Sequence, residues 1–109
     1  MIIAVAGPYS AETHEQRQKN LDAMNETAAR LLEAGHVPFI GVNAALPVVE
    51  RSKVADKYGS VMKISLELVN MCDGILMIGE SKGACMERDL ILSKGLPVYY
   101  SLDEVPPAD

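Results

Sequence analysis

Residues 74–95, GILMIGESKGACMERDLILSKG, contain the pattern that decides the fold. Residues 74–78 are almost continuously apolar, which is typical of a parallel strand that is buried on both faces. A loop of small and polar residues follows, and apolar residues then recur at helical spacing over residues 82–94, before Gly95 ends the helix. The stretch therefore predicts a central strand, a loop at its carboxyl end and a helix.

The same alternation is found on both sides of this stretch. Residues 2–6, IIAVA, predict a second buried strand, which opens at Gly7-Pro8 into a loop. A helix follows, for which Thr13 is the expected cap with Gln16 as its capping-box partner, and Gly35 is its stop. Two further strands are predicted by residues 36–40, HVPFI, and by residues 97–100, PVYY.

Three segments are less regular. Residues 41–58 could hold a short helix, but Pro47 and mixed periodicity favour a loop-like excursion. Residues 60–71 predict a helix that is apolar almost all round, which favours burial on several sides and hence a homo-oligomer, a dimer or larger. The Pro-rich residues 101–109 are expected to form a loosely held tail.

Strands that alternate with helices indicate a parallel sheet covered by helices. We therefore expect residues 1–109 to form a single α/β domain, a small Rossmann- or flavodoxin-like three-layer sandwich with four or five parallel strands. A strand order of 2-1-3-4 would bring the loops after the first and third strands side by side. Ligands of such sheets bind at the carboxyl ends of the strands, where the strand order reverses.

Composition excludes several classes of function. The chain has 109 residues, 49% of them hydrophobic, and a net charge of −5, which argues against a surface that binds a nucleic-acid polymer. A small anion is still possible, since helix amides bind phosphate without basic side chains. Cys72 and Cys85 have no metal-type spacing with the histidines, so buried free thiols are favoured over a redox role and no metal is expected.

Targeting signals and common nucleotide motifs are missing as well. The sequence contains no signal-peptide pattern and no apolar run of membrane-spanning length, so a soluble cytoplasmic protein is expected. The dinucleotide fingerprint, the P-loop and the serine-hydrolase elbow are all absent, and no cofactor is expected.

The candidate site therefore lies in two loops, GPYS at residues 7–10 and GESKGA at residues 79–84. Behind the second loop stands Glu87. On spacing alone, a carboxylate that stabilises the first turn of a helix is the stronger interpretation, and a reactive group is the alternative.

The chain resembles the nucleoside 2-deoxyribosyltransferase-like family, which includes the nucleoside 5′-monophosphate N-glycoside hydrolases. The resemblance covers nearly the whole chain in element order. It rests on AGPYS (6–10), LLEAGHVPFI (31–40), CDGILMI (72–78) and above all on the pattern Ser81-x-Gly83-x-x-x-Glu87. It implies that Glu87 is a nucleophile that attacks C1′ of a nucleoside or its 5′-monophosphate, in hydrolysis or deoxyribosyl transfer.

The resemblance also implies roles for the two loops. Ser81 stands where the monophosphate hydrolases carry a phosphate-binding serine, although an ordinary helix cap explains this residue equally well. Tyr9 stands where the family places a residue that contacts the sugar or orients the nucleophile, and its alternative is packing against the sheet. The remaining residues expected to bind substrate or phosphate are Gly7, Pro8, Ser10, Gly83 and Ala84.

One position departs from the family pattern. Many active members carry an Asp eight residues before the Asp that opens the third strand, and counting back from Asp73 gives Ser65. If that Asp protonates the leaving base, its loss removes general acid catalysis, typically worth about 10²–10⁴-fold. This departure keeps open the alternative of a non-catalytic nucleotide-binding or sensor module. Asp73 itself is expected to secure the start of its strand.

Overall fold

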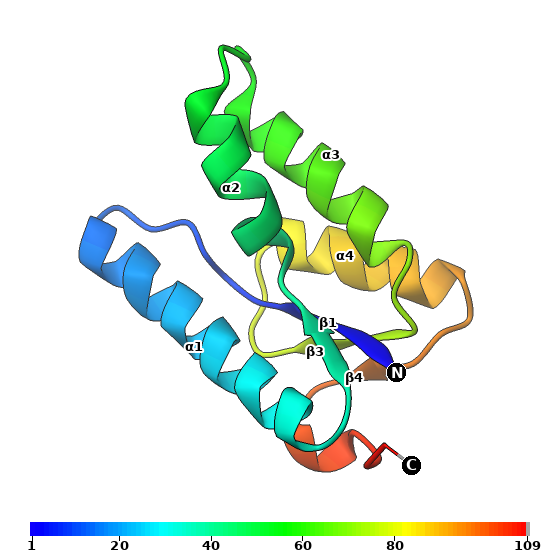
Figure 1. Ribbon diagram of the computed structural model, residues 1–109. Coiled ribbons are helices and arrows are strands. Elements are labelled where there is room, and N and C mark those ends of the chain that lie inside the picture. The colour runs from blue at the N-terminus through cyan, green and yellow to red at the C-terminus, as the bar shows by residue number, and fades with distance from the viewer. Residues whose placement is uncertain (109) are drawn as a thin grey trace.

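The computed structural model describes residues 1–108, which form an α/β sandwich (Figure 1). In this part of the chain, four parallel strands make one sheet in the order β2-β1-β3-β4. The strands are β1 (Ile2–Ala6), β2 (Val37–Phe39), β3 (Gly74–Met77) and β4 (Val98–Tyr99). The predicted fold class and strand order are therefore confirmed, and the order reverses between β1 and β3.

The helices cover both faces of the sheet and extend past one end of it. They are α1 (His14–Glu33), α2 (Gly41–Arg51), α3 (Lys57–Val69) and α4 (Lys82–Ser93), followed by the short 3₁₀ helix η1 (Leu102–Glu104). In Figure 1, α1 and α4 lie on either side of the strands, whereas α2 and α3 pack together and project from the sheet. The projecting pair stands near the start of α4.

Two apolar clusters form the core, one on each face of the sheet. Because successive side chains of a strand point to opposite faces, β1 sends Ile3 and Val5 towards α1, and Ala4 and Ala6 towards α4. The first cluster includes Met24, Ala28 and Leu31 of α1. The second includes Val69 and Cys72 near the end of α3, together with Ala84 and Ile91 of α4. Burial on both faces explains why β1 and β3 are continuously apolar.

Two contacts at the ends of elements, the Thr13 cap of α1 and the Asp73 contact at the start of β3, are present as predicted. The Oγ1 atom of Thr13 accepts a 3.1 Å hydrogen bond from the amide of Gln16, as expected for the cap of α1. The reciprocal half of the capping box is missing, because the Gln16 side chain donates to Asn20 instead. Asp73 accepts a 2.8 Å hydrogen bond from the amide of Ile2, so its carboxylate joins the starts of β1 and β3.

The prediction of a loop-like excursion over residues 41–58 is wrong. Residues 41–51 form α2 in spite of Pro47, which is exposed on the outer side of the helix. The buried residues Gly41, Ala45 and Val49 recur every fourth position and make the stripe that packs on α3. Tertiary packing of that stripe outweighs the hydrogen bond that proline cannot donate.

α3 starts earlier than predicted and is buried along one stripe. Asp56 caps it by accepting a 2.8 Å hydrogen bond from the amide of Gly59. Met62, Ser65 and Val69 are the buried residues, while several other apolar side chains of the helix are half-buried. Met71, expected at its end, lies beyond the helix and is 65% exposed.

The tail differs from the expectation of a loosely held segment over residues 101–109. Val105 packs against the cluster beside α1, and the amide of Ala108 donates to the carbonyl of Ala34. The ring of His36, 2% exposed, lies with Nε2 at 2.7 Å from the carbonyl of Pro106. Residue 109 lies outside the described part. No helix within residues 1–108 is long and apolar enough to cross a membrane.

Candidate functional site

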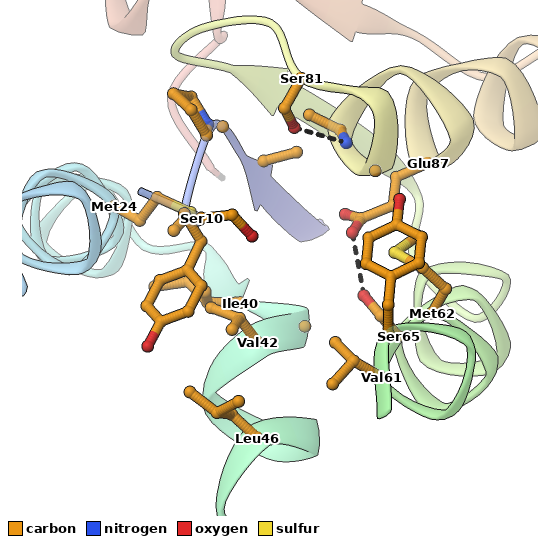
Figure 2. Close-up of a pocket in the computed structure, with 18 of the residues that line it drawn as sticks. Ser10, Met24, Ile40, Val42, Leu46, Val61, Met62, Ser65, Ser81 and Glu87 are labelled. Carbon is orange, nitrogen blue, oxygen red and sulfur yellow. Dashed lines mark hydrogen bonds between the residues drawn. The ribbon is translucent and has the colours of Figure 1, made fainter. Parts of the chain in front are cut away.

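A cavity of about 440 Å³ opens at the carboxyl ends of β1 and β3. Its volume is within the range of sites for small molecules. The loops after β1 and β3 form one side, and α2, α3 and the start of α4 form most of the rest, with the end of β1 and Met24 of α1 completing the lining. Figure 2 shows the side chains that surround it, with Glu87 and Ser65 on one side and Val42 and Leu46 on another. The cavity thus lies where the strand order reverses, as expected for this architecture.

All eight residues proposed from the sequence line this cavity. The first loop contributes four of them and the α4 region the other four: Gly7, Pro8, Tyr9, Ser10, Ser81, Gly83, Ala84 and Glu87. They come together because β1 and β3 are neighbours in the sheet, with Ala6 opposite Met77 at the ends of the two strands.

Glu87 is the buried acid of the site. It is 9% exposed, on the inward face of α4 between Ala84 and Ile91. The hydroxyl of Ser65 donates a 2.9 Å hydrogen bond to its Oε1 atom. Burial raises the pKa of Glu87 from 4.5 to about 7, and the hydrogen bond from Ser65 opposes this rise. Near neutral pH the group therefore exists both as a carboxylate and as a carboxylic acid.

The second oxygen of Glu87 is left for a ligand. Within residues 1–108, only Oε1 of this carboxyl group takes part in a hydrogen bond. In the same part of the chain, no polar side-chain atom that is fully closed off lacks a partner. Oε2 therefore has contact with the cavity, and Figure 2 shows the carboxyl group pointing into it. The interpretation of Glu87 as a carboxylate of the first helical turn is wrong, because Ser81 caps α4 and the first turn of this helix contains no acid.

Ser65 and Gly41 fit together closely. Ser65 is 1% exposed, on the buried stripe of α3. A Cβ atom added to Gly41, at the start of α2, would come within 1.8 Å of the Ser65 Oγ atom. A side chain at position 41 would therefore displace Ser65 or its hydrogen bond to Glu87. Ser65 is thus the direct hydrogen-bond partner of Glu87.

The start of α4 is capped by Ser81 and packs closely against Met62 and Tyr58 of α3. Ser81 Oγ accepts a 3.1 Å hydrogen bond from the amide of Ala84, so this serine is the N-cap of α4. A Cβ atom on Gly83 would lie 3.0 Å from the Met62 sulfur and 3.6 Å from the Tyr58 hydroxyl. The ammonium of Lys82 lies 6.0 Å from the centre of the Tyr58 ring. A cation, a serine hydroxyl and a helix N-terminus thus meet at the edge of the cavity, which suits an anion.

Tyr9 is partly packed and partly available. Its ring is half-buried against the cluster beside α1, and it also lines the cavity. The side chain of Asn20 holds the loop by donating a 3.0 Å hydrogen bond to the Tyr9 carbonyl. Both interpretations of Tyr9, packing against the sheet and a place beside a ligand, are compatible with this position.

Sequence reasoning missed the wall formed by α2 and α3. The additional lining residues from these helices include Val42, Leu46, Val49, Glu50, Lys57, Tyr58, Val61 and Met62. The spacing of Gly41, Ala45 and Val49 was the available signal for α2, and Pro47 concealed it. Lys82 also lines the cavity and was not among the predicted site residues, although it belongs to the GESKGA loop at residues 79–84.

The cysteines and acids within residues 1–108 make no metal-type cluster of three or more potential ligands. Cys72 and Cys85 are both free thiols; Cys72 is buried, as expected, while Cys85 is half-buried. Burial, and then the neighbouring carboxylates of Asp73 and Glu87, raise the pKa of Cys72 to about 11. This thiol is therefore protonated and unreactive at neutral pH.

The fold and the cavity define a small parallel α/β sandwich with a buried glutamate at its strand-order reversal. The chain belongs to a family described as a domain of unknown function, DUF4406, whose model matches residues 1–100. No curated protein matches the chain significantly. The matched region includes every residue of the cavity.

Proposed function

We propose that this chain cleaves the N-glycosidic bond of a nucleoside, a 2′-deoxynucleoside or the corresponding 5′-monophosphate, with Glu87 as the nucleophile. The observation that carries the proposal is the Glu87 carboxyl group, which is buried, held through Oε1 and open to the cavity through Oε2. A fixed carboxylate is suited to capture a sugar whose C1′ atom becomes positively charged as the base departs. Water, or a second base, would then release the sugar from Glu87.

The edge of the cavity supports a phosphorylated substrate. The Ser81 hydroxyl, the first amides of α4 and the ammonium of Lys82 are donors suited to a 5′-phosphate. In this arrangement, Glu87 would lie one helical turn further along α4, beneath the sugar. Tyr9 and Ser10, from the loop after β1, would then contact the sugar or the phosphate.

The test is base release from ribo- and deoxyribonucleosides and their 5′-monophosphates, with a free base added in parallel assays to detect transfer. We expect release by the wild type and a loss of at least about 10²-fold in Glu87→Gln. Glu67→Gln, which changes an exposed carboxyl group on α3, is the matched control and should keep full activity. Release that is undiminished in Glu87→Gln would contradict the proposal.

A non-catalytic nucleotide-binding or sensor module is the second candidate. It is favoured by Ser65, since a hydroxyl rather than a second carboxyl group is the partner of Glu87. This candidate requires that nucleotides raise the melting temperature and are recovered intact. Nucleotides that leave the melting temperature unchanged would remove its basis.

We also propose that the protein works as a homodimer or larger homo-oligomer in the cytoplasm. Val48, Val54 and Tyr58, at the projecting end of α2 and α3, are 60%, 41% and 48% exposed, and a second subunit would cover them. The two unpaired cysteines suit a reducing compartment. A monomeric mass at micromolar concentration in solution would contradict the proposed assembly.

A further inference from the structure

The polar groups of the cavity are divided between its depth and its mouth. The buried side chains that line it are apolar except for two, Ser65 and Glu87. The exposed lining residues, by contrast, include most of its ionisable side chains: Glu50, Lys57, Tyr58 and Lys82. A ring bound beside Glu87 is therefore surrounded by apolar groups, whereas charged groups lie at the opening.

This division limits how a departing base obtains a proton. When the bond from C1′ to a neutral purine or pyrimidine breaks, the base leaves as an anion unless an acid protonates it. The hydroxyl proton of Ser65 already points to Oε1 of Glu87. Glu87 itself cannot attack as a carboxylate and donate a proton in the same step. The half-buried Tyr9 carries a phenol, a much weaker acid than a carboxylic acid.

We infer that the substrates handled best are N-glycosides whose leaving ring bears a permanent positive charge, such as a pyridinium ring or an N7-alkylated purine. The inference rests on the proposed function and deepens it, because it names the class of substrate for the same site. A ring of this kind leaves as a neutral molecule and needs no acid.

The proposed reaction balances without a further reactant. Oε2 of Glu87 forms a bond to C1′, the bond from C1′ to the ring nitrogen breaks, and its electron pair cancels the positive charge of the ring. The products of this step are a neutral base and a neutral glycosyl ester. Water then adds its oxygen to C1′, the Glu87 carboxylate leaves, and the proton goes to solvent.

Charge complementarity supports the same class. A cationic ring would pair with the Glu87 carboxylate at low dielectric, where the attraction between opposite charges is strong. The pairing also compensates for the burial that disfavours the ionised form of Glu87. The exposed lining residues carry two ammonium groups, Lys57 and Lys82, and one carboxylate, Glu50, so a 5′-phosphate at the mouth would meet a net positive charge. A nucleotide with an anionic phosphate and a cationic ring matches both ends of the cavity.

The decisive experiment compares two substrates that differ by one methyl group and one charge, 7-methylguanosine 5′-monophosphate and guanosine 5′-monophosphate. Each is assayed as the ribo and the deoxyribo compound, and nicotinamide mononucleotide is added as a pyridinium probe. Rates in Glu87→Gln are subtracted to remove spontaneous loss of the base. A second series uses neutral bases of increasing acidity as leaving groups.

We expect kcat/KM to be at least about 10²-fold higher for the methylated than for the unmethylated nucleotide. Only the unmethylated base needs an acid in order to leave, and general acid catalysis usually contributes at least about this factor. Among neutral bases, kcat/KM should rise steeply with the acidity of the base. Equal rates within tenfold, or a flat dependence on acidity, would overturn the inference and leave the proposed function intact. Release from neither the charged nor the neutral substrates would overturn the proposed function itself.

Discussion

The hydroxyl of Ser65 on α3 donates a 2.9 Å hydrogen bond to Oε1 of Glu87 on α4, 22 residues further along the chain. This contact joins two helices through buried side chains that line the cavity, and it leaves Oε2 of the same carboxyl group for a ligand. Burial raises the pKa of Glu87, and this hydrogen bond opposes the rise.

Removing the Ser65 hydroxyl should destabilise the protein more at high pH than at low pH. In Ser65→Ala, Glu87 loses the hydrogen bond that lowers its pKa, so the pKa should rise further above its ordinary value. We expect the free energy of unfolding to fall by about 1–3 kcal/mol at pH 8, where a buried carboxylate is left unsatisfied, and by less at pH 5. Urea denaturation at both pH values measures the difference.

The control for this variant is Ser93→Ala, which removes an exposed hydroxyl from α4. It should change stability equally at both pH values. An equal loss at pH 5 and pH 8 in Ser65→Ala would mean that the hydroxyl does not act through Glu87.

Stability should fall as pH rises, through the titration of Glu87. The pKa of this group is about 7 in the folded protein and 4.5 as an ordinary glutamate, so the folded state holds the proton more tightly. Between these two values unfolding releases a proton, and the free energy of unfolding therefore decreases with pH by a total of roughly 3 kcal/mol. The loss begins above pH 4.5 and is complete above about pH 7.

Glu87→Gln should abolish this dependence, because the amide has nearly the same shape, stays neutral and still offers Ser65 an oxygen. At pH 8 we expect the variant to be more stable than the wild type, and at pH 4.5 nearly equal to it. Urea midpoints at half-unit steps of pH test this expectation. Parallel curves for the two proteins would show that Glu87 is not the titrating group.

A methyl group at position 41 should disrupt the site from the opposite side. The Cβ atom of Gly41→Ala would lie 1.8 Å from Ser65 Oγ and 2.8 Å from Ser65 Cβ, so helix α2 or Ser65 must shift. We expect a loss of about 1–3 kcal/mol from overpacking, despite the higher helix propensity of alanine. In the double variant Gly41→Ala/Ser65→Gly, both of the contacted atoms are removed. Its loss of stability should therefore be smaller than the sum of the losses in the two single variants.

Gly83→Ala is the comparison, since its new methyl group would first meet the flexible Met62 side chain at 3.0 Å. Its effect should be smaller than that of Gly41→Ala. Strict additivity of Gly41→Ala and Ser65→Gly would disprove the coupling between the two positions.

If Glu87 is the nucleophile, kcat/KM for base release should increase as pH rises through about 7, because attack requires the carboxylate. The other ionisable groups that line the cavity are those of Tyr9, Glu50, Lys57, Tyr58 and Lys82, and Cys72 lies near the acid as well. A rate profile for guanosine 5′-monophosphate, whose base is uncharged, should be measured for the wild type and for Ser65→Ala. The rise should be displaced to higher pH in the variant. A rate that increases towards acid pH would exclude attack by the carboxylate.

Much of the fold follows from local patterns in the sequence. The apolar runs of β1 and β3, the Thr13 cap and the glycines at positions 35 and 95 each act over a few residues, so they can be recognised without the tertiary structure. Both glycines have positive φ, 91° and 71°, as expected for helix ends. The same local patterns predicted that the two candidate loops directly follow β1 and β3.

By itself, the sequence determined the order of the four strands and of helices α1, α3 and α4, the parallel sheet, and the eight residues of the two strand-end regions that line the cavity. Only the tertiary structure decided that α2 forms across Pro47, that the tail docks on His36, and that Ser65 reaches Glu87 through the space left by Gly41. The physical reason is distance along the chain. Propensity and periodicity are properties of neighbouring residues, whereas these contacts gain their free energy from burial against segments that are remote in the sequence.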